Sequence, residues 1–247
     1  MEKSLKIQEI YNYLNEISPF NTQESWDNSG ILIGDSNNEV KDIFVCLEVT
    51  KDIINSATKD SLIISHHPLI FKPLNRIIFN EYPSNLIIML IQKNISLIAM
   101  HTNFDLSHLN ESFARDILGF ENINKQNLIC SINFEDKFNS LITMLNSKLK
   151  GSVLKITRSK DYIKNIAIIC GAGLNAIEKI KDFDCIITGD VKYHDAMKLK
   201  SLGISVIDVG HYDSERHFAE LIYKNLKNIN YNAIILDSQN PFYFIKG

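Results

Sequence analysis

The sequence contains no apolar run approaching the roughly 20 residues that a membrane-spanning helix needs. Its beginning also lacks an apolar stretch that leads to a small-residue cleavage site, so we expect a cytoplasmic protein. The formal net charge is only −3, and like charges do not gather in long blocks. Neither a membrane surface nor a nucleic acid is therefore indicated as a partner.

Paired cysteines are missing as well. The four cysteines, Cys46, Cys130, Cys170 and Cys185, form no CxxC motif, and three of them lie in apolar, strand-like runs. We therefore expect buried, reduced thiols rather than disulfides or thiolate metal ligands.

The chain does have enough apolar material for a large core. Hydrophobic residues make up 45% of its 247 residues, which allows one large or two small domains. From Ile43 onward, short apolar runs alternate with segments of helical periodicity, an order typical of parallel strands joined by helical crossovers. The pattern predicts an α/β protein with largely parallel sheets flanked by helices. Expected strands are 43–49, 62–65, 95–100, 166–170, 185–188, 205–209 and 233–236, and expected helices are 4–17, 51–58, 83–93, 110–118 (capped by Asn110), 135–149, 174–181, 194–201 and 214–226.

The two halves of the chain share this order of elements, although their residues are not visibly alike. We therefore expect two similar α/β lobes, residues 1–125 and 126–247, with the final strand packing on either of them. No linker rich in proline, glycine or serine marks the junction, so the lobes are expected to pack closely.

Histidine follows three of the expected strands. His66 and His67 come directly after one of them, and His101 and His211 follow two others. In parallel α/β sheets, ligands bind outside the carboxyl ends of the strands. Taken singly, each histidine is more simply explained as a strand cap or as a partner of a backbone carbonyl. As a set, four of seven histidines at such ends favour a shared site, whereas His108 and His217, which have no such setting, are expected to face solvent.

Two carboxylates accompany these histidines. Asp105 lies four residues after His101, and Glu215 lies four residues after His211, a spacing that places each pair on one face of a helical turn. Imidazole and carboxylate ligands without thiolate suit zinc, manganese or iron. Six candidate ligands are more than one tetrahedral ion takes, so we expect two divalent metal ions per chain.

Two segments of the second half leave alternatives open. Asp190 either caps the helix that follows it or, together with His194, supports the site from outside the ligand set or contacts the substrate. The segment Gly171–Ala176 follows a strand and opens a helix, as a dinucleotide-binding fingerprint does, but a lone match is weak. Its backbone amides could instead hold a substrate phosphate.

Five segments taken together resemble the Nif-three-like family, whose members often carry the name GTP cyclohydrolase 1 type 2. These segments are Trp26–Gly30, His66–Phe71, His101–Asp105, Thr188–Asp195 and Gly210–Glu215. The match runs in order from about residue 5 to residue 236, and the length resembles the short form of the family, without an inserted domain.

The resemblance implies two similar, intertwined α/β lobes with a dinuclear metal centre in the cleft between them, and a toroidal homohexamer. Carried over residue by residue, the family's metal ligands fall on His66, His67, Asp105, His211 and Glu215. His101 matches a family histidine beside the centre.

The resemblance further implies a metal-dependent hydrolase that converts GTP to a dihydroneopterin triphosphate with release of formate. His101 and His194 are the candidates for relaying protons in that reaction. Two alternatives remain open. The chain could be a metal-binding hexameric scaffold that acts through protein partners, or a phosphoester hydrolase, because paired metal ions also serve phosphatases and nucleases.

Overall fold

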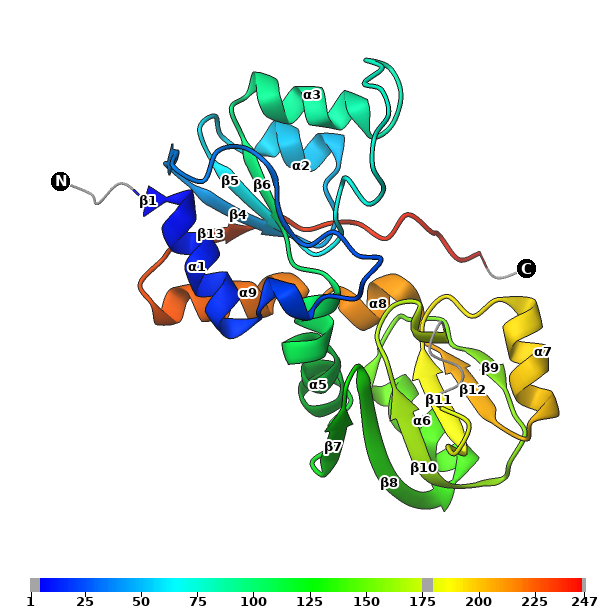
Figure 1. Cartoon of the computed structure of the whole chain (residues 1–247). Helices are drawn as coiled ribbons and strands as arrows, with labels where there is room; N and C mark the ends of the chain where they lie inside the picture. The colour runs from blue at the N-terminus through cyan, green and yellow to red at the C-terminus, as the bar shows by residue number, and fades with distance from the viewer. Residues whose placement is uncertain (1–4, 175–179, 246–247) are drawn as a thin grey trace. The chain divides into compact units, whose positions relative to one another are not determined.

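The computed structural model describes residues 5–174 and 180–245. They form two compact units, each built on its own sheet (Figure 1). The first unit contains the described residues up to Ser107 together with His217–Gln239, and the second contains His108–Arg216 with the described residues from Asn240 onward. The predicted α/β class is confirmed, whereas the predicted division between residues 125 and 126 stays a prediction. No helix within the described ranges is long and apolar enough to cross a membrane.

The first unit is organised around a five-stranded sheet. Its strands are β2 (Gly30–Ile33), β4 (Ile43–Cys46), β5 (Leu62–Ser65), β6 (Ser96–Ala99) and β13 (Ala233–Ile235), in the order β13-β4-β5-β6-β2. The three central strands are parallel and buried along their whole length, as in sheets covered on both faces. The final strand of the chain pairs in parallel with β4, while β2 runs antiparallel to β6. Separately, β1 (Leu5–Lys6) pairs with β3 (Glu39–Val40).

Helices cover this sheet on two sides (Figure 1). They are α1 (Ile7–Ile17), α2 (Lys51–Ser56), α3 (Ser84–Gln92) and α9 (Phe218–Asn228), with a short turn of helix, η1, at Phe20–Thr22. On one side, Ile54 of α2 and Leu90 of α3 join the apolar cluster that includes Phe44 of the sheet. On the other side, the Tyr13 hydroxyl of α1 donates a hydrogen bond to the Asn225 carbonyl of α9, 2.9 Å away. Burial on both faces explains why the central strands are mainly apolar.

The second unit has a mixed six-stranded sheet. Its strands are β7 (Ile123–Gln126), β8 (Ile129–Lys137), β9 (Lys155–Thr157), β10 (Tyr162–Ile168), β11 (Cys185–Thr188) and β12 (Ser205–Asp208), in the order β7-β8-β10-β11-β12-β9. Only β10, β11 and β12 are parallel, and the outer pairs are antiparallel. The helices of this unit include α6 (Phe138–Lys148), α7 (Tyr193–Ser201) and α8 (His211–Glu215). Leu199 of α7 packs with Ile186 and Val206 of the parallel strands.

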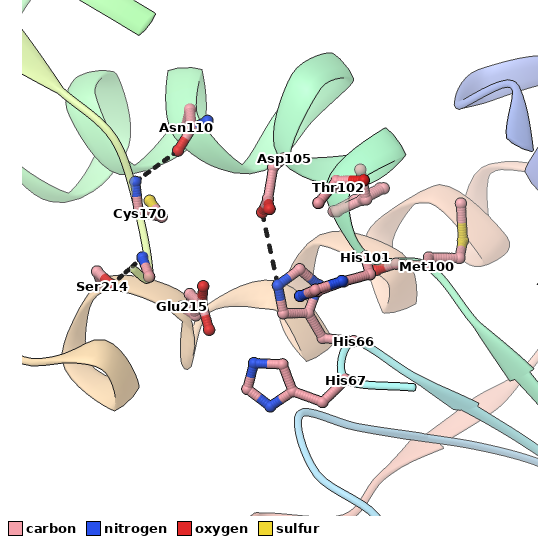
Figure 2. Close-up of polar contacts among 12 residues, drawn as sticks. His66, His67, Met100, His101, Thr102, Asp105, Asn110, Cys170, Ser214 and Glu215 are labelled. Carbon is pink, nitrogen blue, oxygen red and sulfur yellow. Dashed lines mark hydrogen bonds and ion pairs between the residues drawn. The ribbon is translucent and has the colours of Figure 1, made fainter. Parts of the chain in front are cut away.

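A helical stretch precedes this second sheet in the chain. It consists of α4 (Thr102–Phe104), η2 (Asp105–Leu109), α5 (Asn110–Ser112) and η3 (Phe113–Ile117), of which η2 and η3 have the wide turns of a π-helix. The prediction that Asn110 caps a helix is wrong, because helical turns begin at Thr102. The Asn110 side chain instead donates to the Leu128 carbonyl (2.9 Å) and accepts from the Cys170 amide (2.7 Å, Figure 2).

Several boundaries differ from those predicted. Residues 135–137 end strand β8, and α6 begins only at Phe138, so the start of that predicted helix is wrong. The predicted helix at 214–226 is divided between α8 and α9. Most of the predicted helix at 174–181 lies outside the described residues.

All four cysteines are buried, as predicted, and they form no disulfide with one another. Burial raises the pKa of the Cys130 thiol to about 11, and it also raises the pKa values of Cys46 and Cys185. These thiols are therefore protonated at neutral pH and are poor metal ligands.

Candidate functional site

In the first unit, two parallel strands end side by side and position three imidazoles. Ser65, the last residue of β5, pairs in register with Ala99, the last residue of β6. The chain then continues into His66 and His67 after β5, and into His101 after β6. The ring centroid of His66 lies 5.0 Å from that of His67 and 5.1 Å from that of His101, and the centroids of His67 and His101 are 5.7 Å apart. Figure 2 shows the three rings together. One ring nitrogen of each lies within 4.8 Å of the others, close enough to share a metal ion.

A carboxylate from the neighbouring helix joins these rings. Asp105 opens η2, and its Oδ1 lies 3.5 Å from Nε2 of His66 (Figure 2). The His66 side chain is fully buried and that of Asp105 is 13% exposed. A carboxylate and an imidazole buried together are stabilised by a proton or a cation between them.

The Nδ1 atoms of the three imidazoles each face an oxygen. The pairs are His66 with the Met100 carbonyl (2.8 Å), His67 with Oε2 of Glu48 (2.7 Å) and His101 with Oδ1 of Asp27 (2.7 Å). Carbonyl and ionised carboxylate oxygens only accept hydrogen bonds, so in each pair Nδ1 carries the proton and donates it. A neutral imidazole protonated at Nδ1 presents its lone pair at Nε2, the form in which histidine binds metals.

Asp27 is the most strongly bound of these carboxylates, and its side chain is not exposed at all. Oδ1 accepts from His101 and from the Asn28 amide (2.7 Å), while Oδ2 accepts from the Thr102 amide (3.0 Å) and hydroxyl (2.5 Å). Burial by itself would raise the pKa of Asp27. The hydrogen bonds from His101 and Thr102 and the electrostatic interaction with His101 outweigh burial and hold that pKa well below its ordinary value.

In the second unit, β11 and β12 also end in register, with Thr188 paired to Asp208. His211 opens α8, and its Nε2 lies 3.0 Å from Oε2 of Glu215 one helical turn later, as the four-residue spacing predicts. His211 Nδ1 lies 2.6 Å from Oδ2 of Asp190. Like His67 and His101, this ring therefore directs Nδ1 to a carboxylate oxygen. Of the two alternatives for Asp190, the structure favours support of His211, because α7 begins after Lys192.

Two glycines allow the chain to pass close to these donors. Gly171 has φ +59°, and a Cβ there would collide with Oε1 of Glu215. A Cβ at Gly189 would lie 2.7 Å from the His211 amide nitrogen. Gly171 thus borders a candidate metal ligand, and Ala176 of the dinucleotide-like segment lies outside the described residues.

The donor groups of both units fit a divalent cation. The first unit offers three imidazoles and a carboxylate, and the second offers an imidazole and a carboxylate. Neutral imidazoles held by oxygen partners, with carboxylates and no thiolate, suit zinc, manganese or iron.

The remaining predicted residues divide as follows. His194 lies exposed on α7, with its ring edge-on to Tyr193 at 5.4 Å, and its role stays a prediction. The expectation that His217 faces solvent is wrong, since it is only 7% exposed. It immediately precedes Phe218, which is buried with its ring centroid 4.9 Å from that of His66. His108 is half-buried.

Sequence reasoning missed Asp27 and Glu48 as partners of the imidazoles. Each of them nevertheless has a feature that could have identified it. Asp27 belongs to the segment Trp26–Gly30 that carries the family resemblance. Glu48 stands two residues beyond the end of β4, as His67 stands two residues beyond the end of β5, and these strands pair in parallel.

The fold and these donor groups define an α/β protein equipped to bind divalent metal ions. The chain belongs to the Duf34/NIF3 (NGG1p interacting factor 3) family, whose sequence model matches residues 5–241. It is 46% identical over 241 residues to a protein from Campylobacter jejuni named GTP cyclohydrolase 1 type 2 homolog, covering 97% of this chain and 100% of the relative. It is 45% identical over 240 residues to the Helicobacter pylori (strain J99) GTP cyclohydrolase 1 type 2, covering 97% and 99% of the two chains. The crystal structure of a Staphylococcus aureus hypothetical protein superposes with a TM-score of 0.83 at 28% identity, covering 98% of this chain and 100% of that chain.

Proposed function

We propose that this chain is a cytoplasmic, metal-dependent hydrolase that opens the guanine ring of GTP and yields dihydroneopterin triphosphate and formate. The observation that carries the proposal is the hydrogen bonding of the histidines. Each of His66, His67 and His211 directs Nδ1 to an oxygen, which leaves Nε2 oriented as a metal ligand. The choice of GTP is supported by the relatives at 45% and 46% identity, whose names include GTP cyclohydrolase 1 type 2.

We assign the metal ligands to His66, His67 and Asp105 of the first unit and to His211 and Glu215 of the second. Together these five side chains would hold two divalent ions, with zinc, manganese and iron as the candidates. Bound there, the ions would supply a Lewis acid and an activated water.

His101 and His194 are the proposed proton carriers. In this reaction both carbon–nitrogen bonds to C8 of guanine are hydrolysed, C8 leaves as formate, and each departing nitrogen needs a proton. Asp27 keeps the proton of His101 on Nδ1, so Nε2 can accept a proton and return it. His194 is exposed and could exchange protons with solvent.

The test measures formate release and pteridine fluorescence from GTP with protein loaded separately with zinc, manganese and iron. We expect product with at least one metal, and loss of at least about 100-fold in rate for Glu215→Ala and His67→Ala, by analogy with removal of a principal catalytic group. Glu121→Gln, an exposed charge change in the second unit, serves as the control and should keep the wild-type rate. Formate release at the wild-type, metal-loaded rate by metal-free protein or by Glu215→Ala would overturn the proposal.

We also propose that the chain assembles into the toroidal homohexamer that its family resemblance implies. The support is an exposed apolar segment near the C-terminus, in which four successive side chains are at least 62% exposed. They are Phe242 (70%), Tyr243 (87%), Phe244 (62%) and Ile245 (92%). Contiguous exposed apolar surface usually marks an interaction site. Light scattering after size exclusion should give six times the chain mass, and truncation after Asn240 should reduce it, whereas a monomer mass for the full chain would contradict the assembly.

The same exposed segment favours a second candidate, a metal-binding scaffold for other proteins. A hexamer with two bound metals per chain that releases no formate would support this candidate. Hydrolysis of bis(p-nitrophenyl) phosphate by that same sample would instead support phosphoester hydrolysis.

A further inference from the structure

We propose that Trp26 and Phe71 form a stacking platform for the planar base of a nucleotide, beside the imidazoles of the first unit. This inference deepens the proposed function and rests on its nucleotide substrate. Trp26 is 51% exposed and Phe71 is 42% exposed, although both are large apolar rings. Their centroids are 5.9 Å apart at an interplanar angle of 64°.

The two rings adjoin His101. The centroid of His101 lies 6.2 Å from that of Trp26 and 6.2 Å from that of Phe71, with interplanar angles of 78° and 84°. No pair among the three is stacked face to face; each contact sets the edge of one ring against a face of the other. His101 in turn contacts His67, at 5.7 Å between centroids. The exposed rings of Trp26 and Phe71 are therefore connected through His101 to His67, a candidate metal ligand.

The backbone that carries these rings is firmly held. Asp27, which follows Trp26, is bound to His101 and Thr102 through both carboxylate oxygens. The Asn28 side chain donates to the carbonyl of Ile70, the residue before Phe71, at 2.5 Å. The loop of Trp26 is therefore tied to the segment of Phe71 and to the first turn after β6.

Two apolar rings held half in water contribute less to stability than buried rings would, since exposed apolar surface gains nothing from burial. Adjacent exposed apolar side chains are characteristic of a surface that binds something. A planar heteroaromatic base matches it, because every base has a π-face that stacks on aromatic side chains. A base lying on Trp26 or Phe71 would have its edge near His101 and His67, the imidazoles proposed to act on it.

The sequence provides the probe for a direct test, because Trp26 is the only tryptophan. Zinc-loaded protein is titrated with GTP, guanosine and inorganic triphosphate while tryptophan fluorescence is recorded. We expect saturable quenching by GTP and by guanosine, and none by triphosphate. Equal quenching by triphosphate, or no quenching by guanosine at millimolar concentration, would overturn the platform.

Affinity of the variants is measured by equilibrium dialysis with labelled GTP, which needs no tryptophan signal. Phe71→Leu and Trp26→Leu should each weaken binding about tenfold, the loss expected for one stacked ring. Trp26→Phe keeps a flat ring and should retain most of the affinity, while Phe79→Leu, at a residue 79% exposed in the same unit, should bind GTP like the wild type. Wild-type affinity in both Leu variants would contradict the proposal, as would a Trp26 side chain shielded from acrylamide by a second copy of the chain.

Formate release separates this inference from the proposed function. Quenching by guanosine without formate release would leave the platform intact and overturn the cyclohydrolase. Formate release with an unchanged KM for GTP in Trp26→Leu and Phe71→Leu would do the reverse.

Discussion

Asp27→Asn removes the charge from the most densely hydrogen-bonded carboxylate of the first unit. The wild-type oxygens accept from the ring of His101, from the amides of Asn28 and Thr102, and from the hydroxyls of Thr102 and Ser29. An asparagine keeps one accepting oxygen, so the better orientation turns that oxygen to His101 and points the amide group at Thr102. The Thr102 hydroxyl can rotate to accept, but the Thr102 amide loses its partner in a buried position.

The expected cost follows from these contacts. Hydrogen bonds to a charged group contribute about 1.5–3 kcal/mol, and a buried donor left without a partner costs about 1–3 kcal/mol. We therefore expect Asp27→Asn to lower the free energy of unfolding by about 3 kcal/mol. Urea unfolding of metal-free protein, followed by circular dichroism, measures the change. Asp60→Asn, in which an exposed carboxylate is replaced, is the control and should leave the midpoint nearly unchanged.

A loss below about 1 kcal/mol for Asp27→Asn would refute this reasoning, because it would mean that the charge-assisted bonds are not formed. The slope of the unfolding free energy against urea concentration is the second readout. A loss of the expected size with a changed slope would indicate a change in the unfolded or partly folded states instead. Only a shifted midpoint at constant slope agrees with the structure.

Three further predictions concern the same contacts. Glu48→Gln removes the carboxylate that orients His67 and should weaken metal binding about 10- to 100-fold in a chelator competition, with little change in stability because Glu48 is 41% exposed. Gly171→Ala should weaken metal binding at least about tenfold, as for loss of an orienting contact, because its Cβ would displace the Glu215 carboxylate. Asp27 has a folded-state pKa held below its ordinary value of 3.8, so its stabilisation is complete above the unfolded-state pKa and is lost as pH falls toward the folded-state value. Below about pH 4, metal-free wild type should therefore lose thermal stability more steeply than Asp27→Asn.

Matched variants separate these effects from general damage. Glu81→Gln changes an exposed charge in the same unit as Glu48 and should bind metal like the wild type. Gly203→Ala places a Cβ at φ +74° with no atom within 4 Å, so it shares the backbone strain of Gly171→Ala without the collision. If both glycine variants bind metal equally well, crowding of Glu215 is the wrong explanation. Parallel acid melting curves for wild type and Asp27→Asn would likewise exclude the pH argument.

The sequence predicted the central parallel strands best. Strands β5 and β11 begin and end where expected, because each is a short apolar run buried on both faces. The antiparallel edges were harder. Strand β8 starts in the core and ends in the exposed, charged residues 135–137, which resemble the start of a helix. Strand β9 has only three residues, none of them buried, so its pattern gives little signal.

The proximity of His66, His67 and His101 was predictable because parallel strands bring their carboxyl ends to one edge. His66 and His101 are 35 positions apart, yet strand register alone places them together. The partners of these rings were not predictable in the same way. Asp27 reaches His101 across 74 positions through a loop whose course depends on several side-chain hydrogen bonds, and no periodicity encodes such a contact.

We propose that five side chains of this chain hold two divalent ions. The most direct test is a crystal structure of metal-loaded protein with anomalous diffraction recorded at the absorption edge of the metal. We expect two anomalous peaks per chain, with His66, His67, Asp105, His211 and Glu215 as the protein ligands and imidazole coordination through Nε2. Peaks elsewhere, a single ion, or coordination through Nδ1 with the bonds to Glu48 and Asp190 broken would contradict it.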